Sequence, residues 1–285
     1  MTLRKMILAA VLAMASTASL AADLAPQEVE PISPQQAFDW SGFYAGASVG
    51  GRLLDSTWTA TELRTPGSPQ AGAQVAIDRT SPRDYALRGV HFGGFVGYNF
   101  LIAPRWLAGV EADGGYAHDR KGRGGIPGCI IVNGCVTGAS TPVLIPFGGD
   151  SARVGMGWDA SLRARAGYLV TPDLLVFGTA GVALQQVKVG ATCGAIVSSN
   201  YCFGTSGQPG IRRDKTKTPV GWTLGAGAEW HVWGNWLLRA EYRYANYGKV
   251  DGTLPLNLTA IDYNTYRMKL KVQTHTLALG LAYKF

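Results

Sequence analysis

Large apolar side chains alternate with small or polar ones along much of the chain. The alternation is most regular at the end, where Leu277, Leu279, Leu281, Tyr283 and Phe285 are separated by small residues and one lysine. A period of two is the pattern of a β-strand with one apolar face. Partial or full alternation predicts eight such strands, at about 41–51, 88–99, 106–117, 155–170, 174–188, 219–232, 236–247 and 273–285.

The connections between these segments alternate in length. Those at 100–105, 171–173 and 232–235 are tight, and those at about 52–87, 118–154, 189–218 and 248–272 are long. Transmembrane barrels have short periplasmic turns and long extracellular loops, and their strands need about 9–11 residues to cross the bilayer. The sequence therefore predicts an all-β fold over residues 40–285: an eight-stranded antiparallel up-and-down transmembrane β-barrel with four long extracellular loops and short periplasmic turns.

Charged residues share one face of the predicted strands. In a soluble lipocalin-like barrel this face would meet water, whereas in a membrane barrel it points inward. Trp and Tyr near both ends of the strands, such as Trp106 and Trp158, favour the membrane arrangement. The facing of 41–51, 88–99 and 174–188 stays open. An eight-stranded barrel has room inside for side chains only, so inward charges must pair. The predicted interior polar network consists of Glu111, Asp113, Asp159, Arg163, Arg165, Glu229, Arg239, Glu241 and Arg243.

The N-terminal residues have a different character from the barrel. Arg4 and Lys5 precede a short apolar run and then small residues, which predicts a secretory signal peptide over 1–21. Residues 22–39 are rich in Pro, Gln and acidic side chains, as is typical of a flexible periplasmic linker. The composition agrees with an exported β protein, because 38 of 285 residues are Gly and only 16% are charged.

Four cysteines would enter an oxidising compartment after export, which makes disulfides the expectation. The candidates are Cys129, Cys135, Cys193 and Cys202. Three pairings are open, and proximity in sequence favours Cys129 with Cys135 and Cys193 with Cys202. A metal site is the alternative, but no His lies near either pair. We therefore predict no metal and no cofactor.

Two stretches resemble a known family. The segment FDWSGFYAGASVGG (38–51) resembles the first-strand signature of small Gram-negative outer-membrane barrels, the opacity-protein-like and outer-membrane immunogenic protein group. The terminal LALGLAYKF is similar to the final-strand signal of outer-membrane proteins. The resemblance implies a Gram-negative outer-membrane location and insertion by the barrel assembly machinery. It also implies a role as a structural envelope protein, surface antigen, adhesin or porin. The residues that match the C-terminal assembly signal are Leu279, Leu281, Tyr283 and Phe285.

The sequence favours a non-catalytic structural barrel whose loops serve envelope integrity and surface interaction. A small porin is the first alternative, and it requires the interior charges to line water. A lipid A-modifying enzyme is the second, and it requires a His with a Ser and an acid at one interface. His118 beside Asp119, with Ser151 across the same loop, is the candidate arrangement for that chemistry.

The formal net charge of +7 gathers in the predicted loops. Anionic lipopolysaccharide of the outer leaflet is the nearest partner for such loops. A host or glycan ligand is an open alternative, and export argues against nucleic acid. The cations in question are Lys188, Arg212, Arg213, Lys215, Lys217, Lys249, Arg267, Lys269 and Lys271, with Asp214, Asp251 and Asp262 among them.

Overall fold

The computed structural model describes residues 38–64, 77, 79–128, 151–193, 211–255 and 265–285. The predicted signal peptide and all but the end of the predicted linker lie outside these residues. The described part contains no helix with the length and hydropathy that a membrane crossing needs. Its strands are β1 (Gly42–Arg64), β2 (Arg83–Ala103), β3 (Trp106–Gly124), β4 (Ser151–Thr171), β5 (Leu174–Cys193), β6 (Ile211–Lys217), β7 (Val220–Trp233), β8 (Trp236–Pro255) and β9 (Thr265–Lys284).

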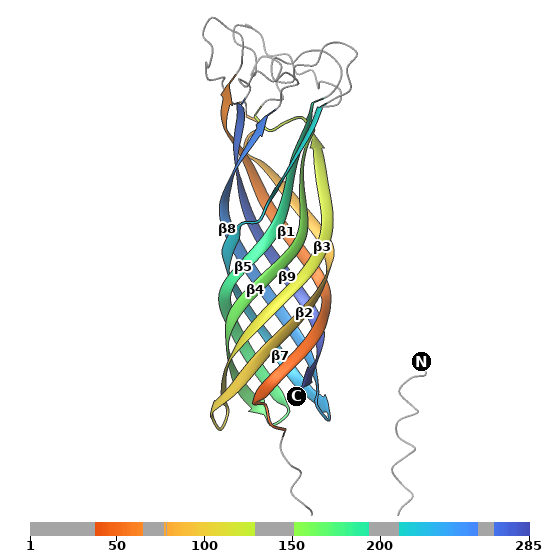
Figure 1. The fold of residues 1–285 in the computed structure, drawn as a ribbon, viewed down its shortest axis with the longest axis vertical. Helices are drawn as coiled ribbons and strands as arrows, with labels where there is room; N and C mark the ends of the chain where they lie inside the picture. Colours follow the sequence, from red (N-terminus) through yellow and green to blue (C-terminus); the bar gives the residue numbers. More distant parts are fainter. Residues whose placement is uncertain (1–37, 65–76, 78, 129–150, 194–210, 256–264) are drawn as a thin grey trace, which may run out of the picture. The chain divides into compact units, whose positions relative to one another are not determined.

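Eight of these strands form a closed antiparallel ring (Figure 1). The sheet runs β4-β3-β2-β1-β9-β8-β7-β5, and a further pairing of β4 with β5 closes it. The predicted eight-stranded barrel is thus confirmed. Strand β6 pairs with the upper part of β5 and continues the course of β7, from which Thr218 and Pro219 separate it. Since proline has no N–H to donate, a break in the ladder at Pro219 is expected.

Most of the strands are longer than predicted, and β1 is about twice as long. Apart from β6 and β7, they contain 19 to 23 residues each. The expected long loops are therefore shorter, because parts of each, such as 52–64 and 265–272, belong to strands. The predicted ends of these strands were wrong because the prediction followed outward-facing apolar residues. That pattern stops partway along each strand, where the outward residues become charged.

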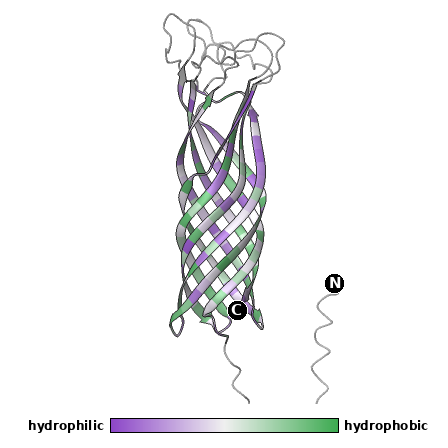
Figure 2. Cartoon of the chain, in the orientation of Figure 1, coloured by the Kyte–Doolittle hydropathy of each residue, from purple (hydrophilic) through white to green (hydrophobic). Residues whose placement is uncertain are grey.

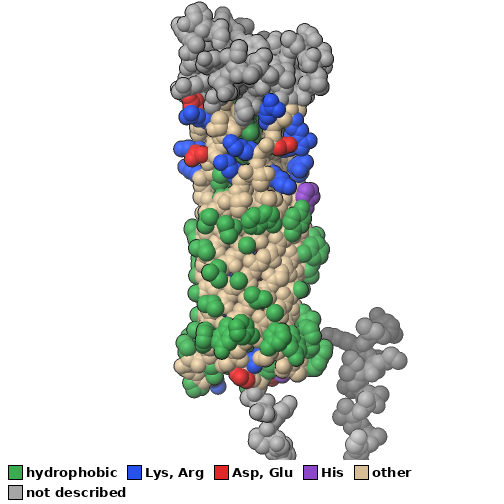
Figure 3. Space-filling model, in the orientation of Figure 1, with side chains coloured by type: hydrophobic (Ala, Val, Ile, Leu, Met, Phe, Trp, Pro, Cys, Tyr) green, Lys and Arg blue, Asp and Glu red, His purple; other side chains and the backbone are tan. Residues whose placement is uncertain are grey.

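The reason lies in an inversion of the alternation along each strand. In β9 the outward residues from Leu277 to Leu281 are apolar, whereas outward Arg267, Lys269 and Lys271 are charged. The inward residues change in the opposite sense, from Gly and Thr to Leu270 and its apolar neighbours. In β1 the change falls between two adjacent leucines, because Leu53 is exposed and Leu54 is buried. Figure 2 shows hydrophobic and hydrophilic residues alternating along the strands. Figure 3 shows the resulting surface, which is apolar along the lower barrel and charged above it.

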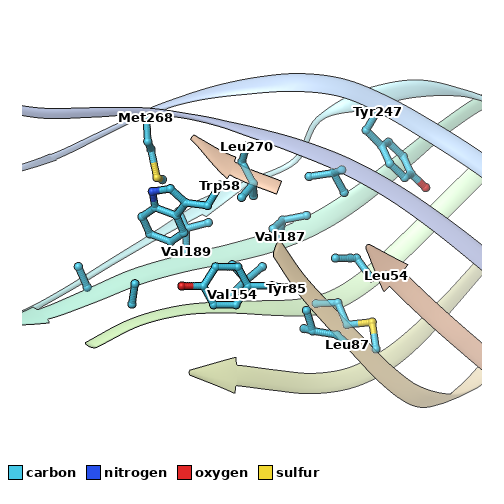
Figure 4. Close-up of a cluster of buried hydrophobic side chains, with 14 of the residues drawn as sticks. Leu54, Trp58, Tyr85, Leu87, Val154, Val187, Val189, Tyr247, Met268 and Leu270 are labelled. Carbon is cyan, nitrogen blue, oxygen red and sulfur yellow. The ribbon is translucent and has the colours of Figure 1, made fainter. Parts of the chain in front are cut away.

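We call the lower part the banded section and the upper part the loop-side extension. The extension has an apolar interior like that of a soluble barrel (Figure 4). Trp58 lies at its centre with no exposed surface, and its Nε1 donates a hydrogen bond to the Tyr266 hydroxyl at 2.8 Å. The extension comprises 54–64 of β1, 83–88 of β2, 118–124 of β3, 151–156 of β4, 187–193 of β5, all of β6, 247–255 of β8 and 265–275 of β9.

The short-turn end of the barrel is closed by a second apolar cluster. Trp40 is buried there and donates from its Nε1 to the carbonyl oxygen of Pro172 at 2.9 Å. Phe38 stacks on the ring of His231 with centroids 4.2 Å apart. The chain that enters β1 therefore packs inside the barrel mouth. Its partners in this cluster are Tyr44, Phe95, Leu107, Leu169, Leu175, Leu237 and Ala282.

The structure also settles the faces that the sequence left open. Phe92 and Val176 are exposed on the apolar band, whereas Phe95 and Phe177 are buried inside. The inward phenylalanines are exceptions to a polar interior, and arginines stack on them. The Arg165 guanidinium lies 4.0 Å from the centroid of the Phe177 ring.

Truncation of Trp58 to Ala should loosen the extension and leave the banded section intact. The loss of a buried Trp typically costs about 3–5 kcal/mol, and here a hydrogen bond is lost as well. Limited trypsin digestion of the purified protein in micelles measures this loosening. In the variant, the backbone at the exposed lysines of β8 and β9 should leave the strand pairing and be cleaved. Thr59→Ala, which changes the neighbouring outward residue, is the control. Equal digestion of both variants would show that the apolar interior does not hold the extension together.

Candidate functional site

The interior of the banded section is built around one carboxylate. Glu111 on β3 is buried, with 1% of its surface exposed. Both of its oxygens accept from Arg239 of β8, at 2.5 and 2.8 Å, and Oε1 also accepts from Arg163 of β4 at 2.5 Å. The Tyr44 hydroxyl donates to Oε2 at 2.7 Å. Two-point guanidinium–carboxylate bonds fix both partners in plane, so Glu111 joins β1, β3, β4 and β8 across the lumen.

A second carboxylate extends the network toward β7. Glu229 accepts two hydrogen bonds from Arg165, at 3.0 and 2.5 Å. Arg239 completes a link to Glu241 on its own strand, at 2.9 Å. Because Arg239 also contacts Glu111, the bonds form one connected group. Connected ionic networks of this kind stiffen an interior, whereas a charge left without its counter-ion would be costly.

The upper end of the network is organised by Asp159. Its Oδ2 accepts from Arg52 at 2.7 Å and from Arg243 at 3.0 Å, and His91 Nε2 lies 3.1 Å from Oδ1. Arg52 also donates from Nε to Thr276 at 2.9 Å. Five guanidinium groups thus meet five carboxylates. The ion pairs include Arg52, Arg163, Arg165, Arg239 and Arg243 with Glu111, Asp113, Asp159, Glu229 and Glu241.

All nine residues that the sequence placed in an interior polar network lie inside the barrel and take part in these ion pairs. Sequence reasoning missed Arg52 and Tyr44. Arg52 was assigned to the connection at about 52–87, whereas it lies on β1. The signal that could have found Arg52 is its even spacing from Tyr44 along β1.

Glycines next to the network make room for its largest members. Gly97 faces Tyr44 across β1 and β2, and a Cβ there would overlap the tyrosine ring. A Cβ at Gly115 would likewise overlap the ring of His91. The enclosed space beside the network measures about 30 Å³ and is lined by His91, Arg163 and Arg243 among others. That volume is of the order of a single water molecule.

The arrangement that the enzyme alternative requires is not formed by the described residues. His118 contacts Tyr116, with Nδ1 3.3 Å from the hydroxyl and the two rings stacked. The Asp119 carboxylate accepts from the backbone N–H groups of Arg88 and Arg120. Ser151 pairs with Gly124 at the far end of β3. No hydrogen bond joins these three candidates within the described part of the chain.

Most of the predicted basic loop residues lie on strands instead of loops. Arg212, Arg213 and Lys215 are on β6, and Lys269 and Lys271 are on β9, and all five side chains are exposed. Partial burial raises the pKa of the Asp214 carboxyl, but hydrogen bonds from Arg153 and Arg212 outweigh it and lower the pKa below its ordinary value. Asp262, Cys129, Cys135 and Cys202 lie outside the described residues, as does the side chain of Cys193, where β5 ends.

Replacement of Glu111 by Gln should destabilise the barrel strongly. The change leaves three arginines facing a neutral amide, and the removal of one partner from a buried ionic group costs about 3–5 kcal/mol. Urea-induced unfolding in lipid vesicles measures the loss. Asp173→Asn is the control, because Asp173 pairs with His231 at an exposed turn and such pairs contribute about 0–1 kcal/mol. Similar midpoints for the two variants would contradict the central role of Glu111.

The chain is similar to known outer-membrane proteins. A family model described as outer membrane protein beta-barrel domain matches residues 7–285. The chain is 30% identical over 295 residues to the 31 kDa outer-membrane immunogenic protein of Brucella melitensis, with 99% of this chain and 100% of the relative covered. It is 27% identical to the 25 kDa outer-membrane immunogenic protein of Brucella abortus, with 100% and 99% covered.

Among solved structures, the outer membrane protein OprG from Pseudomonas aeruginosa is 13% identical, covers 86% of this chain and 96% of its own, and has a TM-score of 0.43. The family match spans nearly the whole chain, and the relatives are outer-membrane proteins. The apolar band is therefore the surface that meets the outer membrane of a Gram-negative bacterium. The chain belongs to the outer-membrane protein β-barrel family, as the resemblance of its first and last strands implied.

Proposed function

We propose that this protein is a non-conducting, non-catalytic structural barrel that anchors a rigid surface platform in the outer membrane. The observation that carries the proposal is an interior filled with side chains over its whole height. From the periplasmic side, a solute would meet the apolar cluster around Trp40, then the ion pairs around Glu111, then the apolar interior around Trp58. An eight-stranded barrel has a lumen of side-chain width, so each layer blocks it.

The length of the strands supports the platform. A strand of 20 residues, such as β9, spans about 65 Å along its axis and about 50 Å along the barrel at the usual tilt. The apolar band of such barrels is about 25 Å tall. About half of the barrel then stands outside the membrane, where water explains its charged exterior and apolar interior. This geometry would raise four inter-strand connections above the lipid for surface interaction of an antigen-like or adhesin-like kind.

The charged exterior supports lipopolysaccharide as the neighbouring partner. The cations of β6, β8 and β9 are exposed on the extension. Figure 3 shows Lys and Arg side chains on its surface directly above the band. The phosphate-rich headgroup layer of the outer leaflet would lie at this height. Opposite charges at close range would hold the extension upright and tie the barrel into the layer. A host or glycan ligand would instead engage the connections beyond the strand ends.

Planar bilayer recordings test the closed interior. The purified full-length protein should show no steady single-channel openings, because ion-paired side chains cross the lumen and the space beside them measures only about 30 Å³. A porin reconstituted in the same bilayers serves as the positive control. Steady openings of uniform size would overturn the proposal in favour of the small porin.

The C-terminal residues support insertion by the barrel assembly machinery. The Phe285 side chain is 72% exposed at the periplasmic rim, and its backbone N–H donates to Phe43 at 2.9 Å. The side chain therefore contributes little to packing and is free to act as a recognition element. We propose that Leu279, Leu281, Tyr283 and Phe285 form the assembly signal.

Phe285→Ser keeps the backbone bond and removes only the side chain. It should lower the amount of protein in the outer membrane several-fold at an unchanged expression level. Phe43→Ser is the matched control, since Phe43 is 63% exposed at the same end of the barrel. Fractionation followed by immunoblotting measures both. Equal losses would show that lost lipid contact, not a signal, explains the effect.

A further inference from the structure

The lipid-facing wall has a groove where the chain lacks a side chain. Gly51 of β1 points outward, and a Cβ placed on it would meet no atom within 4 Å. Its cross-strand neighbours are Val90 of β2 and Leu277 of β9, both exposed. Since neighbouring strands lie about 4.8 Å apart, the backbones of Val90 and Leu277 are about 10 Å apart, and no side chain rises from β1 between them. The groove has a volume of about 480 Å³ and also contacts Leu53.

Polar groups border this groove on one side only. In the next outward row toward the extension, Leu53 lies between Arg88 and His275. The Tyr242 hydroxyl lies 2.7 Å from Nδ1 of His275 and holds the ring at the groove edge. Arg88 is exposed, and the ion pairs of the described residues do not involve its guanidinium. The site therefore combines an apolar floor with a cationic upper rim.

A like-charged pair stands above the rim. Lys271 of β9 and Lys249 of β8 are direct cross-strand neighbours, and both are exposed. Like charges in this position repel, so an anion between them would be stabilising. Lys271 precedes His275 by four residues, or about 13 Å along the strand. The one acidic side chain on the intervening outward positions of β1 is Asp55, which faces Gln273.

We propose that this groove binds one molecule of lipid A, the lipopolysaccharide anchor, with an acyl chain over Gly51 and its phosphates at Arg88 and at the Lys249–Lys271 pair. Two observations favour lipid A as the bound lipid: the height of the groove on the barrel wall and the separation of its two cationic positions. The groove lies in the half of the band next to the extension, so it faces the outer leaflet. A lipid with phosphates at both ends of a disaccharide matches two separate cationic positions better than a glycerophospholipid with one phosphate does. This inference rests on the proposed orientation of the extension, but it does not require the lumen to be closed.

The test measures lipid binding by native mass spectrometry of the full-length protein in micelles. Delipidated protein is titrated with bis-phosphorylated lipid A and, separately, with phosphatidylethanolamine. The wild type should retain one lipid A. Gly51→Phe fills the groove from a position with free space and should weaken binding at least tenfold. Arg88→Ala should weaken binding several-fold, with a smaller effect on lipid A that lacks one phosphate.

Two control variants separate the groove from the rest of the wall. Gly178→Phe adds the same side chain at an exposed lipid-facing glycine of β5, and Lys121→Ala removes a cation of the extension from β3. Both should bind like the wild type. The heat-dependent shift of mobility in SDS confirms that each variant is folded, and Gly51→Leu replaces Gly51→Phe if the latter is not.

Equal losses in Gly51→Phe and Gly178→Phe would overturn the site, as would a wild type that retains no lipid A. Equal binding of phosphatidylethanolamine, with the same sensitivity to Gly51→Phe and Arg88→Ala, would overturn the assignment of lipid A. The lipid-binding experiment is independent of conductance. Steady openings in planar bilayers would disprove the closed lumen and would leave the lipid A site unaffected.

Discussion

The strict alternation of side chains in a closed barrel is the constraint on which the rest of this structure depends. Each strand keeps one face inside from end to end, while the medium outside changes from lipid to water. A residue pattern that suits one medium is therefore wrong for the other. β9 shows the solution within 20 residues: its exterior changes from Leu277–Leu281 to Lys269 and Lys271, and its interior changes in the opposite sense. The barrel is a membrane protein below and has the interior of a soluble one above.

The polar layer is a consequence of that constraint in the lower half. Side chains that face lipid must be apolar. If the inward side chains were apolar too, the whole strand would be one long hydrophobic segment before insertion. Arginines and carboxylates inside avoid this, but only if they are paired, because an unpaired buried charge is destabilising. Glu111 meets this demand by accepting from three arginines and a tyrosine. The glycines at 97 and 115 give the space that these large groups occupy.

The same constraint explains which parts of the barrel could be predicted from the sequence. The alternation of Leu and small residues in 277–285 identified a lipid-facing strand directly, and the charges of β3, β4, β7 and β8 marked the inward faces. The upper halves of the strands were not predicted because their alternation is that of a water-soluble barrel, with charged residues outward and apolar residues inward. Arg52 was missed because the predicted strand at 41–51 ends one residue before it, although the switch comes only at Leu54. Bulges in the ladder, as between Met156 and Asp159 of β4, further shift the phase of the alternation.

The switch between the two patterns also makes one height of the wall chemically distinct. There an apolar row and a cationic row are adjacent, as in Gly51 and Leu277 below Arg88 and His275. A ligand that is apolar at one end and anionic at the other meets both rows without reorganising either. Phospholipids and lipopolysaccharide both have this character, and in the orientation that we propose only the outer leaflet reaches this row. A boundary first required by solvation thereby becomes the place on the barrel best suited to recognise a particular lipid.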